Sequence, residues 1–445
     1  MSTAPELEPE AAPDERTKPP FLRRVRIRGY KSIAFCDVTL EPLTVLVGRN
    51  ASGKSNFLDA LAFLRDLMEM RTTEAVNERK GWRAIHCRDN GIPDIEMGFE
   101  ATFLSYKSTW DAEYNFKLGI GNQNQIRVTR EQLMLTQHEK GRRCGYRVSD
   151  GKLEWVGQEH FTNGMQLARD ESEPPIIPGE KLANPELFRQ RRYDRLFLSV
   201  IGTSPFLDLA EGLRASAVYN FSPAAIRIHQ PITASPILAR EGSNLARAIE
   251  GLREIEPLTV DRIGQYLTAI VDGIESFHTV EYGDYETVKF HFAARHGASP
   301  QPFDASSMSD GTLRVLASLI AAYQIVLPSG FPGFIGIEEP ETALHPAAMR
   351  ALVAALDEAT LRTQILLTSH SPDLLDAPEI KPEYVRVVEM VEGKTLITPL
   401  DEASVSIVQD QLNTLGGLER DRQFELNHDD LDRQAALARQ ERPAP

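Results

Sequence analysis

The apolar residues near the N-terminus follow two different spacings, and each spacing predicts a different element. Val25 and Ile27 alternate with arginines, which is typical of a strand with one buried face. Residues 43–47 are apolar apart from one threonine, as expected of a strand inside a sheet that is covered on both faces. From Phe57 to Met68 the apolar residues recur every three or four positions, which predicts a helix. The pattern therefore predicts a strand, a glycine-rich connection and a helix.

The middle of the chain changes to short alternating segments without helices between them. Such runs, separated by Gly, Asn and Asp turns, predict an antiparallel lobe of four strands at 94–103, 114–120, 126–135 and 146–155. Residues 156–215 are mixed and partly helical. They contain no heptad repeat, which excludes a long coiled coil.

The C-terminal half returns to alternating helices and strands, which is typical of an α/β fold with a buried, mostly parallel sheet. Helices are predicted at 244–255, at 259–277 and from Pro346. Strands are predicted at 287–292, 334–337, 364–368 and 385–390. The first twenty residues offer almost nothing to bury and are expected to be a disordered leader. The last thirty residues are polar and charged, and are expected to form a frayed helix or tail.

Composition narrows the class of protein. Hydrophobic residues make up 42% and charged residues 25% of the 445 residues, an ordinary balance for a globular chain. The net charge of −15 argues against a general electrostatic grip on DNA, so any phosphate binding must come from a local patch. Three cysteines without metal-ligand spacing suit a reducing compartment, and no apolar run is long enough to span a bilayer. We therefore expect a cytoplasmic protein without a membrane partner.

The sharpest motif is an uninterrupted GxxxxGKS that directly follows the strand at 43–47. A polyphosphate needs many donors in a small space, and glycines let the backbone N–H groups turn inward at the start of a helix. Lys54 is expected to reach the β- and γ-phosphates of ATP, and the Ser55 hydroxyl to ligate Mg²⁺. The predicted ATP-binding residues are Gly48, Arg49, Asn50, Ala51, Ser52, Gly53, Lys54, Ser55 and Asn56.

Two adjacent carboxylates end the apolar strand at 334–337. Since neighbouring residues of a strand point to opposite faces, Glu338 can hold the Mg²⁺ shell while Glu339 prepares the attacking water. Taken alone, this string is also a common exit from a strand into a turn. Together with the phosphate loop it predicts a second acidic site.

Two further motifs carry anion-binding or proton-handling groups. Ser309, Asp310 and Gly311 open a predicted helix, where a hydroxyl and free N–H groups can bind an anion or simply cap the helix. His370 follows the strand at 364–368, where it can sense a γ-phosphate or orient the water. We therefore list Glu339 and His370 as candidate catalytic residues.

These four motifs, in this order, resemble the ABC-type ATPase heads of the SMC and RecF class, most closely the stand-alone bacterial AAA-family, ABC-like ATPases. Residues 29–33 resemble the first strand and turn of that class, 307–312 fall at the signature and 343–346 at the D-loop. The resemblance covers about residues 21–400. The signature here is Ser-Asp-Gly-Thr rather than Ser-Gly-Gly, and His345 occupies the D-loop aspartate position. Gln123, Gln125 and Gln132 are all candidates for the Q-loop glutamine, and the sequence does not distinguish them.

The resemblance implies a P-loop NTPase fold, hydrolysis of ATP and a second subunit. In this class the signature of one head contacts the γ-phosphate held by the other, so Ser309, Asp310 and Gly311 would act in trans in a head-to-tail homodimer or a higher oligomer. The expected organisation is a leader (1–20), two halves of the head (21–70 and 216–400), an inserted β and helical lobe in place of a coiled coil (71–215), and a tail (401–445).

The process that such an ATPase drives is left open by the sequence. We expect an ATP-driven dimerisation switch that works with a separate effector protein in DNA maintenance or in defence against foreign DNA. Two alternatives are a nucleotide-gated scaffold with weak hydrolysis and an ABC transporter subunit, against which the long insertion argues. Local arginine clusters at 23–28 and 189–195 are typical of a solvated face, and they also leave open a patch that contacts nucleic acid.

Overall fold

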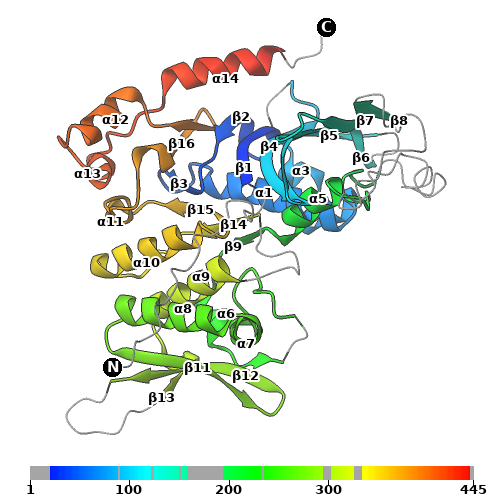
Figure 1. Ribbon diagram of the computed structural model, residues 1–445. Helices are drawn as coiled ribbons and strands as arrows, with labels where there is room; N and C mark the ends of the chain where they lie inside the picture. The colour runs from blue at the N-terminus through cyan, green and yellow to red at the C-terminus, as the bar shows by residue number, and fades with distance from the viewer. Residues whose placement is uncertain are drawn as a thin grey trace, which may run out of the picture.

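The computed structural model describes residues 21–88, 91–121, 125–149, 152–157, 194–232, 235–293, 302–324 and 333–440. The expected leader, Gln123 and the arginines at 189–192 lie outside these residues. Two large sheets occupy the upper part of the molecule, and a helical layer with a small third sheet lies below them (Figure 1).

The central sheet is mostly parallel and confirms the predicted α/β class. Its six strands lie in the order β17-β16-β3-β15-β14-β9. Every pairing among β16, β3, β15, β14 and β9 is parallel, and only the edge strand β17 is antiparallel. The strands are β3 (Leu43–Val47), β9 (Ala217–Tyr219), β14 (Phe334–Glu338), β15 (Gln364–Ser369), β16 (Val385–Val391) and β17 (Lys394–Pro399).

Each strand of this sheet divides its apolar residues between two cores. Leu46 and Leu366 face one core, which also contains α1 (Lys54–Glu69) and the antiparallel sheet. Val45 and Leu367 face the second core, which contains the helical layer. Burial on both faces explains why residues 43–47 carry almost no polar side chain. The second core contains α7 (Leu245–Ile255), α8 (Pro257–Ile270), α9 (Asp310–Tyr323) and α10 (Pro346–Ala359).

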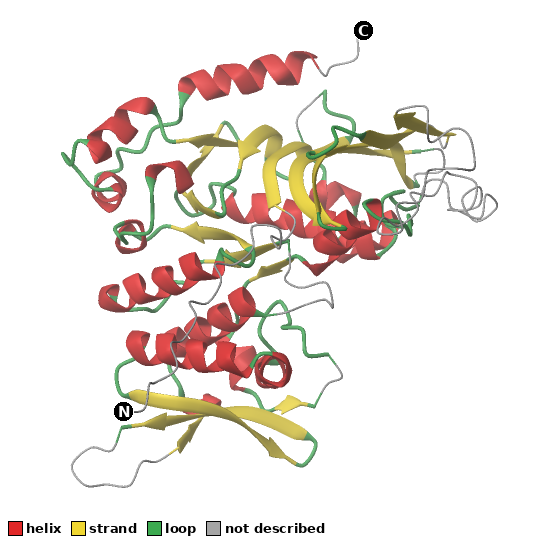
Figure 2. Cartoon of the chain, in the orientation of Figure 1, coloured by secondary structure: helices red, strands yellow, loops and turns green. Residues whose placement is uncertain are grey.

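The antiparallel sheet begins earlier than the expected insertion. It has seven strands in the order β2-β1-β4-β5-β6-β7-β8, so residues 21–39 belong to this sheet and not to the parallel one. Residues 21–30 join this sheet because β1 pairs with a strand that is distant in the sequence: Val25 of β1 lies opposite Phe99 of β4. Its strands are β1 (Phe21–Tyr30), β2 (Ile33–Thr39), β4 (Ile95–Ser105), β5 (Ser108–Ile120), β6 (Ile126–Gln137), β7 (Arg143–Ser149) and β8 (Lys152–Gly157). They appear as the curved yellow layer at the upper right of Figure 2.

Four short helices complete the fold, three beside the antiparallel sheet and α6 in the helical layer. They are α2 (Thr72–Glu78), α3 (Trp82–Ile85), α5 (Phe206–Ala215) and α6 (Pro223–Arg227).

Buried Glu131 of β6 attaches residues 194–201 to the antiparallel sheet, because its carboxylate accepts hydrogen bonds from the backbone N–H groups of Phe197 (2.5 Å) and Leu198 (2.9 Å). The hydroxyls of Tyr114 and Tyr146 donate to the same carboxylate.

The helix predicted at 259–277 is shorter than expected. It ends at Ile270, and residues 274–282 form β11 instead. Gly273, with φ of +85°, makes the turn between helix and strand that a residue with a Cβ adopts only under strain. The third sheet contains β10 (Gln230–Pro231), β11 (Ile274–Tyr282), β12 (Tyr285–Phe292) and β13 (Pro302–Asp304).

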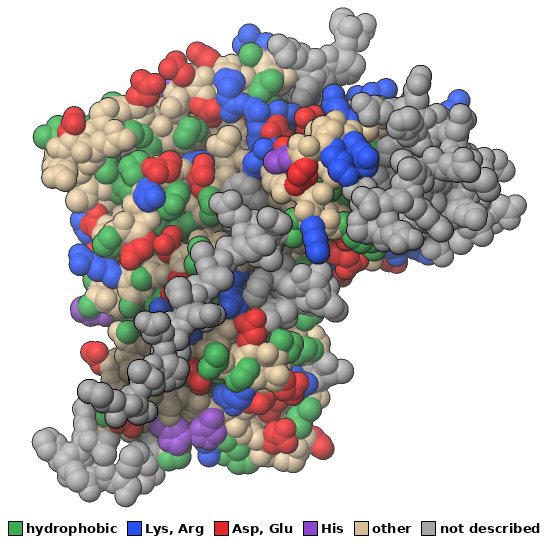
Figure 3. Space-filling view, in the orientation of Figure 1, with side chains coloured by type: hydrophobic (Ala, Val, Ile, Leu, Met, Phe, Trp, Pro, Cys, Tyr) green, Lys and Arg blue, Asp and Glu red, His purple; other side chains and the backbone are tan. Residues whose placement is uncertain are grey.

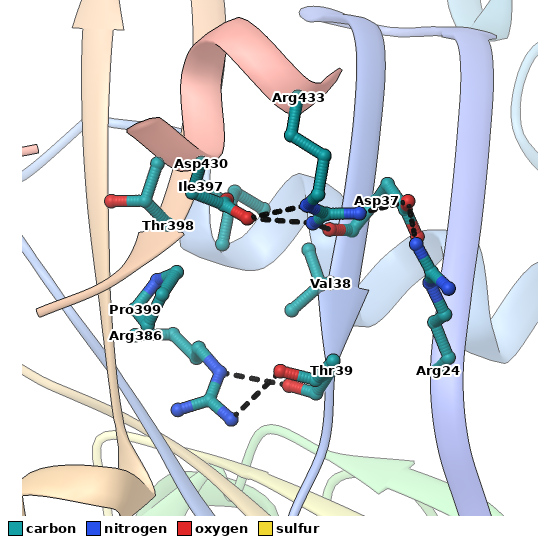
Figure 4. Close-up of a pocket in the computed structure, with 10 residues that line it drawn as sticks. All are labelled: Arg24, Asp37, Val38, Thr39, Arg386, Ile397, Thr398, Pro399, Asp430 and Arg433. Carbon is teal, nitrogen blue, oxygen red and sulfur yellow. Dashed lines mark hydrogen bonds and ion pairs between the residues drawn. The ribbon is translucent and has the colours of Figure 1, made fainter. Parts of the chain in front are cut away.

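The C-terminal residues also differ from the expected polar tail. They form α12 (Glu402–Gln409), α13 (Leu415–Arg420) and α14 (His428–Gln440), beside α11 (Pro372–Leu375) and the edge strands. Arg433 of α14 forms an ion pair with buried Asp37 of β2 at 2.7 Å (Figure 4). Gln434 of the same helix donates to the Ile397 carbonyl oxygen at 2.9 Å. Polar contacts therefore hold α14 against these strands, whereas Leu415 of α13 is buried in the core of the helical layer.

The same contacts border a pocket of about 320 Å³ between α14 and the edge strands. Arg24 also pairs with Asp37, at 2.5 Å, while Arg386 donates to the backbone oxygen of Thr39 at 2.8 Å (Figure 4). The lining arginines therefore already have partners.

Candidate nucleotide site

The glycine-rich loop joins β3 to α1, as the pattern predicts. Gly48 lies so close to β16 that a Cβ there would be 2.1 Å from the Val388 carbonyl oxygen. Gly53 has φ of +108°, and a Cβ there would be 1.9 Å from Thr395 Oγ1 of β17. Both glycines are therefore required by the packing of this loop against the neighbouring strands.

Two residues that sequence reasoning missed support this loop. Thr395 Oγ1 donates to the Ser52 carbonyl oxygen at 3.0 Å and lies 2.7 Å from Ser32 Oγ. Ser32 Oγ in turn accepts a hydrogen bond from Asn56 at 2.6 Å. The network joins segments that are more than 300 residues apart in the sequence, so no local pattern could reveal Thr395.

The loop contains donors that suit a phosphate. Lys54 is buried, and its Nζ donates to the carbonyl oxygens of Gly48 (2.5 Å) and Arg49 (3.1 Å). Burial lowers the pKa of Lys54, against the opposing effect of nearby carboxylates led by Glu339. Ser52 Oγ is also buried and has no hydrogen-bond partner among the described residues. An unpartnered buried hydroxyl beside a lysine and a helix N-terminus fits an anionic ligand such as a phosphate.

The acidic strand end lies directly beside this loop. Ser55 Oγ donates to Glu338 Oε2 at 2.6 Å, although the two residues are 283 positions apart. A hydroxyl and a carboxylate oxygen are hard donors of the kind that Mg²⁺ binds through one or two protein ligands. Ser55 and Glu338 therefore fit a magnesium site that is completed by water and phosphate oxygens.

Glu339 and His370 come together on the solvent side of this edge. Glu339 has a left-handed backbone, with φ of +44°, and its N–H donates to the Thr368 carbonyl oxygen at 3.0 Å. Its carboxylate oxygen Oε1 is 3.5 Å from His370 Nδ1, and the two side chains are 39% and 48% exposed. Water can reach both groups, as a hydrolytic site requires.

Glu341 is a buried carboxylate that sequence reasoning missed. Its Oε1 accepts hydrogen bonds from Ser369 Oγ (2.6 Å) and, weakly, from the His370 N–H (3.4 Å), while burial raises its pKa. Ser369 Oγ accepts from the Ser371 N–H at 3.0 Å. Glu341 thus fixes the backbone that presents His370. The Glu-x-x-Glu spacing after the strand is the only local signal that could have indicated it.

The C-terminal helix α13 packs beside the same edge. Gly416 approaches so closely that a Cβ there would be 2.2 Å from the Pro372 carbonyl oxygen, and Arg420 pairs with Asp373 at 2.9 Å. Burial raises the pKa of Glu419 on this helix, while the nearby charges of Lys54 and His370 lower it. A carboxylate from the presumed tail is therefore part of the electrostatic environment of Lys54.

The signature residues lie elsewhere on the same chain. Ser309 caps α9, and its Oγ accepts from the Thr312 N–H at 3.2 Å. Ser309 and Asp310 are exposed, whereas Gly311 is buried so close to the D-loop that a Cβ would be 2.4 Å from the Ala343 carbonyl oxygen. The structure therefore brings the signature to the D-loop. The side chains of Ser309 and Asp310 form hydrogen bonds with Thr312 and Arg227, and not with the phosphate loop.

The remaining expectations concern the D-loop, the Q-loop and the arginine clusters. His345 caps α10 through its Nδ1, which accepts from the Ala347 N–H at 3.2 Å. Gln132 lies in β6 opposite Asn115, in the antiparallel sheet. Arg24 and Arg26 are engaged by Asp37 and Glu100, and acidic and basic side chains are interspersed on the face shown in Figure 3.

The phosphate loop on β3, the carboxylates after β14 and the histidine after β15 meet at one edge because these three strands are neighbours and parallel. This arrangement defines a P-loop ATPase of the ABC-like class. The chain belongs to the family described as "AAA domain, putative AbiEii toxin, Type IV TA system", whose profile matches residues 43–376. No curated protein sequence matches the chain. Among the described residues, no helix is both long and apolar enough to cross a bilayer.

Several solved structures of SMC heads are similar to this chain at low identity. One is the SMC head domain from Thermotoga maritima, with 12% identity and a TM-score of 0.38 over 86% of this chain and 99% of that one. Another is the Smc head domain of Pyrococcus furiosus bound to the C-terminal domain of ScpA, with 12% identity and a TM-score of 0.44 over 88% and 100%. A third, an SmcHead bound to the C-winged helix domain of ScpA, has 12% identity and a TM-score of 0.46 over 86% and 99%.

Proposed function

We propose that this chain hydrolyses ATP to ADP and phosphate, and that bound ATP joins two copies head to tail. The observation that carries the proposal is the 2.6 Å hydrogen bond between Ser55 and Glu338. It unites the hydroxyl of the phosphate loop with the acidic strand end, and this combination of hydroxyl, carboxylate and phosphate donors serves magnesium nucleotides. Membership of an AAA-domain family supports the same reading.

Each group of residues in the site has a separate role in the proposed reaction. The backbone of residues 48–56 and the Lys54 ammonium bind the β- and γ-phosphates, and Ser55 and Glu338 are the residues that would hold the metal. When bound, Mg²⁺ neutralises charge that develops on the phosphate oxygens. Glu339 accepts a proton from the attacking water, and His370, 3.5 Å away, orients that water or contacts the γ-phosphate. Glu341 holds His370 in position through the Ser369 hydrogen bond.

The position of the signature supports the dimerisation part of this proposal. Ser309 and Asp310 are exposed at the N-terminus of α9, a 14-residue helix whose dipole favours an anion. Ala343 of the D-loop lies against Gly311 and leads directly back to Glu341 and the carboxylates. A γ-phosphate held by a second copy would therefore contact the signature of this copy. ATP then joins the two chains, and hydrolysis releases them.

The driven process is part of the same proposal. We infer a cytoplasmic switch that controls a separate effector in DNA maintenance or in defence against foreign DNA, in keeping with the toxin–antitoxin description of the family. Contacts with nucleic acid would come from local arginines that are not already paired with carboxylates, since the chain carries a net charge of −15.

The test uses the full chain with Mg²⁺-ATP, phosphate release and multi-angle light scattering. Glu339→Gln keeps the shape of the side chain but removes the proton acceptor, so turnover should fall roughly 10²–10⁴-fold and the ATP-bound dimer should persist. Ser309→Arg should prevent the dimer by filling the trans phosphate site, while the monomer still binds ATP.

Three results would each contradict a part of the proposal. Hydrolysis by Glu339→Gln at the parental rate would assign the base to another residue, with His370 next to test. A dimer that forms equally well without ATP, or with arginine at position 309, would place the interface elsewhere. Stable ATP occupancy without turnover in the unmutated chain would favour the nucleotide-gated scaffold.

A further inference from the structure

The signature loop is held by an arginine that no motif indicated. Arg227, the last residue of α6, donates from Nη2 (2.9 Å) and Nε (3.3 Å) to the Met308 carbonyl oxygen. The same Nη2 forms an ion pair with the Asp310 carboxylate. These contacts grip both sides of Ser309, the residue between Met308 and Asp310. The arginine is itself anchored, because Ile226 beside it is fully buried in the core of the helical layer.

Asp310 presents an electrostatic problem for the proposed trans site. Its side chain is 55% exposed and lies in the first turn of α9, adjacent to the Ser309 hydroxyl. An unpaired carboxylate there would repel the γ-phosphate of a second copy, since like charges a few ångströms apart disfavour each other. A signature with glycine in this place would carry no such charge. The departure from Ser-Gly-Gly therefore requires a compensating cation.

We propose that Arg227 is a positioning residue for trans ATP binding. It offsets the Asp310 charge and fixes the signature loop so that the Ser309 hydroxyl and the α9 N–H groups donate hydrogen bonds to the γ-phosphate. This inference rests on the proposed ATP-driven dimer. Nε and Nη2 of Arg227 are committed to Met308 and Asp310, so the arginine acts through the loop and is not itself the phosphate ligand. A planar guanidinium can hold a carbonyl and a carboxylate together, which a lysine ammonium does less well.

The experiment compares variants in the Glu339→Gln chain, in which the ATP-bound dimer should be long-lived. The dimer dissociation constant with Mg²⁺-ATP is measured by analytical ultracentrifugation at low and high salt, and ATP binding by the monomer is measured alongside. Arg227→Ala should weaken the dimer about tenfold or more, because one unpaired charge then faces a polyphosphate. Raising the salt should reduce this defect, since the repulsion is screened.

The decisive variant is the double mutant Arg227→Ala, Asp310→Ala. Removal of the carboxylate should restore most of the lost affinity, while Arg227→Lys alone should be intermediate. Arg262→Ala is the matched control, because Arg262 forms a 2.7 Å surface ion pair with Glu358 on α8 and α10, away from the signature. This control should leave the dimer unchanged.

The outcomes separate this inference from the proposed function. If Glu339→Gln alone does not dimerise with ATP, the proposed function fails. If it does dimerise and Arg227→Ala has no effect, the positioning role is wrong. If the double mutant is as weak as Arg227→Ala, the charge-offset argument is overturned, and Arg227 acts through its Met308 contact or on the phosphate itself.

Discussion

Replacing Glu341 tests the one buried carboxylate of the site that has no direct role in the proposed chemistry. Glu341→Ala removes the acceptor for Ser369 Oγ at 2.6 Å and the weak acceptor for the His370 N–H at 3.4 Å. The Ser369 hydroxyl still accepts from the Ser371 N–H at 3.0 Å but loses the acceptor for its own proton, and a buried donor left unsatisfied costs about 1–3 kcal/mol. The variant also removes the cost of burying the Glu341 carboxylate, the same burial that raises its pKa. We therefore expect the free energy of unfolding to fall by a net amount of about 1–2 kcal/mol.

The same change should loosen the backbone that carries His370. Misplacement of a catalytic group by a fraction of an ångström to 1 Å can cost up to about 10²-fold in rate, so turnover should fall roughly 10- to 100-fold while ATP still binds. Glu341→Gln keeps a carbonyl acceptor at Oε1, so it should lose less stability and less turnover than Glu341→Ala.

The assay measures the free energy of unfolding by urea and the turnover by steady-state phosphate release. Both quantities are compared for Glu341→Ala, Ser369→Ala and the double mutant. Because each single variant breaks the same hydrogen bond, the double-mutant cycle should give a coupling of about 1 kcal/mol. Additive effects of the two substitutions, or parental turnover by Glu341→Ala, would refute the reasoning that Glu341 positions His370 through Ser369.

Three further outcomes are expected. Lys54→Ala should abolish ATP binding with little loss of fold, as checked by nucleotide titration and circular dichroism, because the lysine supplies charge at the phosphate site. Glu338→Gln should raise the Mg²⁺ concentration needed for half-maximal turnover, because a neutral amide binds the ion more weakly; an unchanged requirement would exclude Glu338 from the metal site. Burial opposes ionisation of Asp37, but the hydrogen bonds from Arg24 and then from Arg433 lower the pKa of this carboxylate. The stabilisation from these bonds is therefore complete above the unfolded-state pKa of Asp37 and is lost as pH falls through the lower folded-state pKa. Hydrogen exchange of α14 below about pH 4 should rise in the parent protein and be less pH-dependent in Arg433→Ala.

The motifs that define the class of protein are local, and for that reason the sequence alone determined them. A phosphate loop needs a strand, glycines at fixed positions and a helix, and all of these lie within residues 43–69. The apolar strands 334–337 and 364–368 were also predicted, because burial on both faces of a parallel sheet removes polar residues from the strand itself.

Only the tertiary structure decided which strands are neighbours and which distant residues complete the site. The order β3-β15-β14 places Ser55 beside Glu338 and His370 beside Glu339, and no spacing in the chain specifies that order. Arg227 and Thr395 act across more than 80 and 300 residues, respectively, so their roles depend on packing. The C-terminal residues were predicted only as a frayed helix or tail, because polar contacts such as Arg433 with Asp37 hold α14, and a hydrophobic pattern does not register an ion pair between segments 396 residues apart.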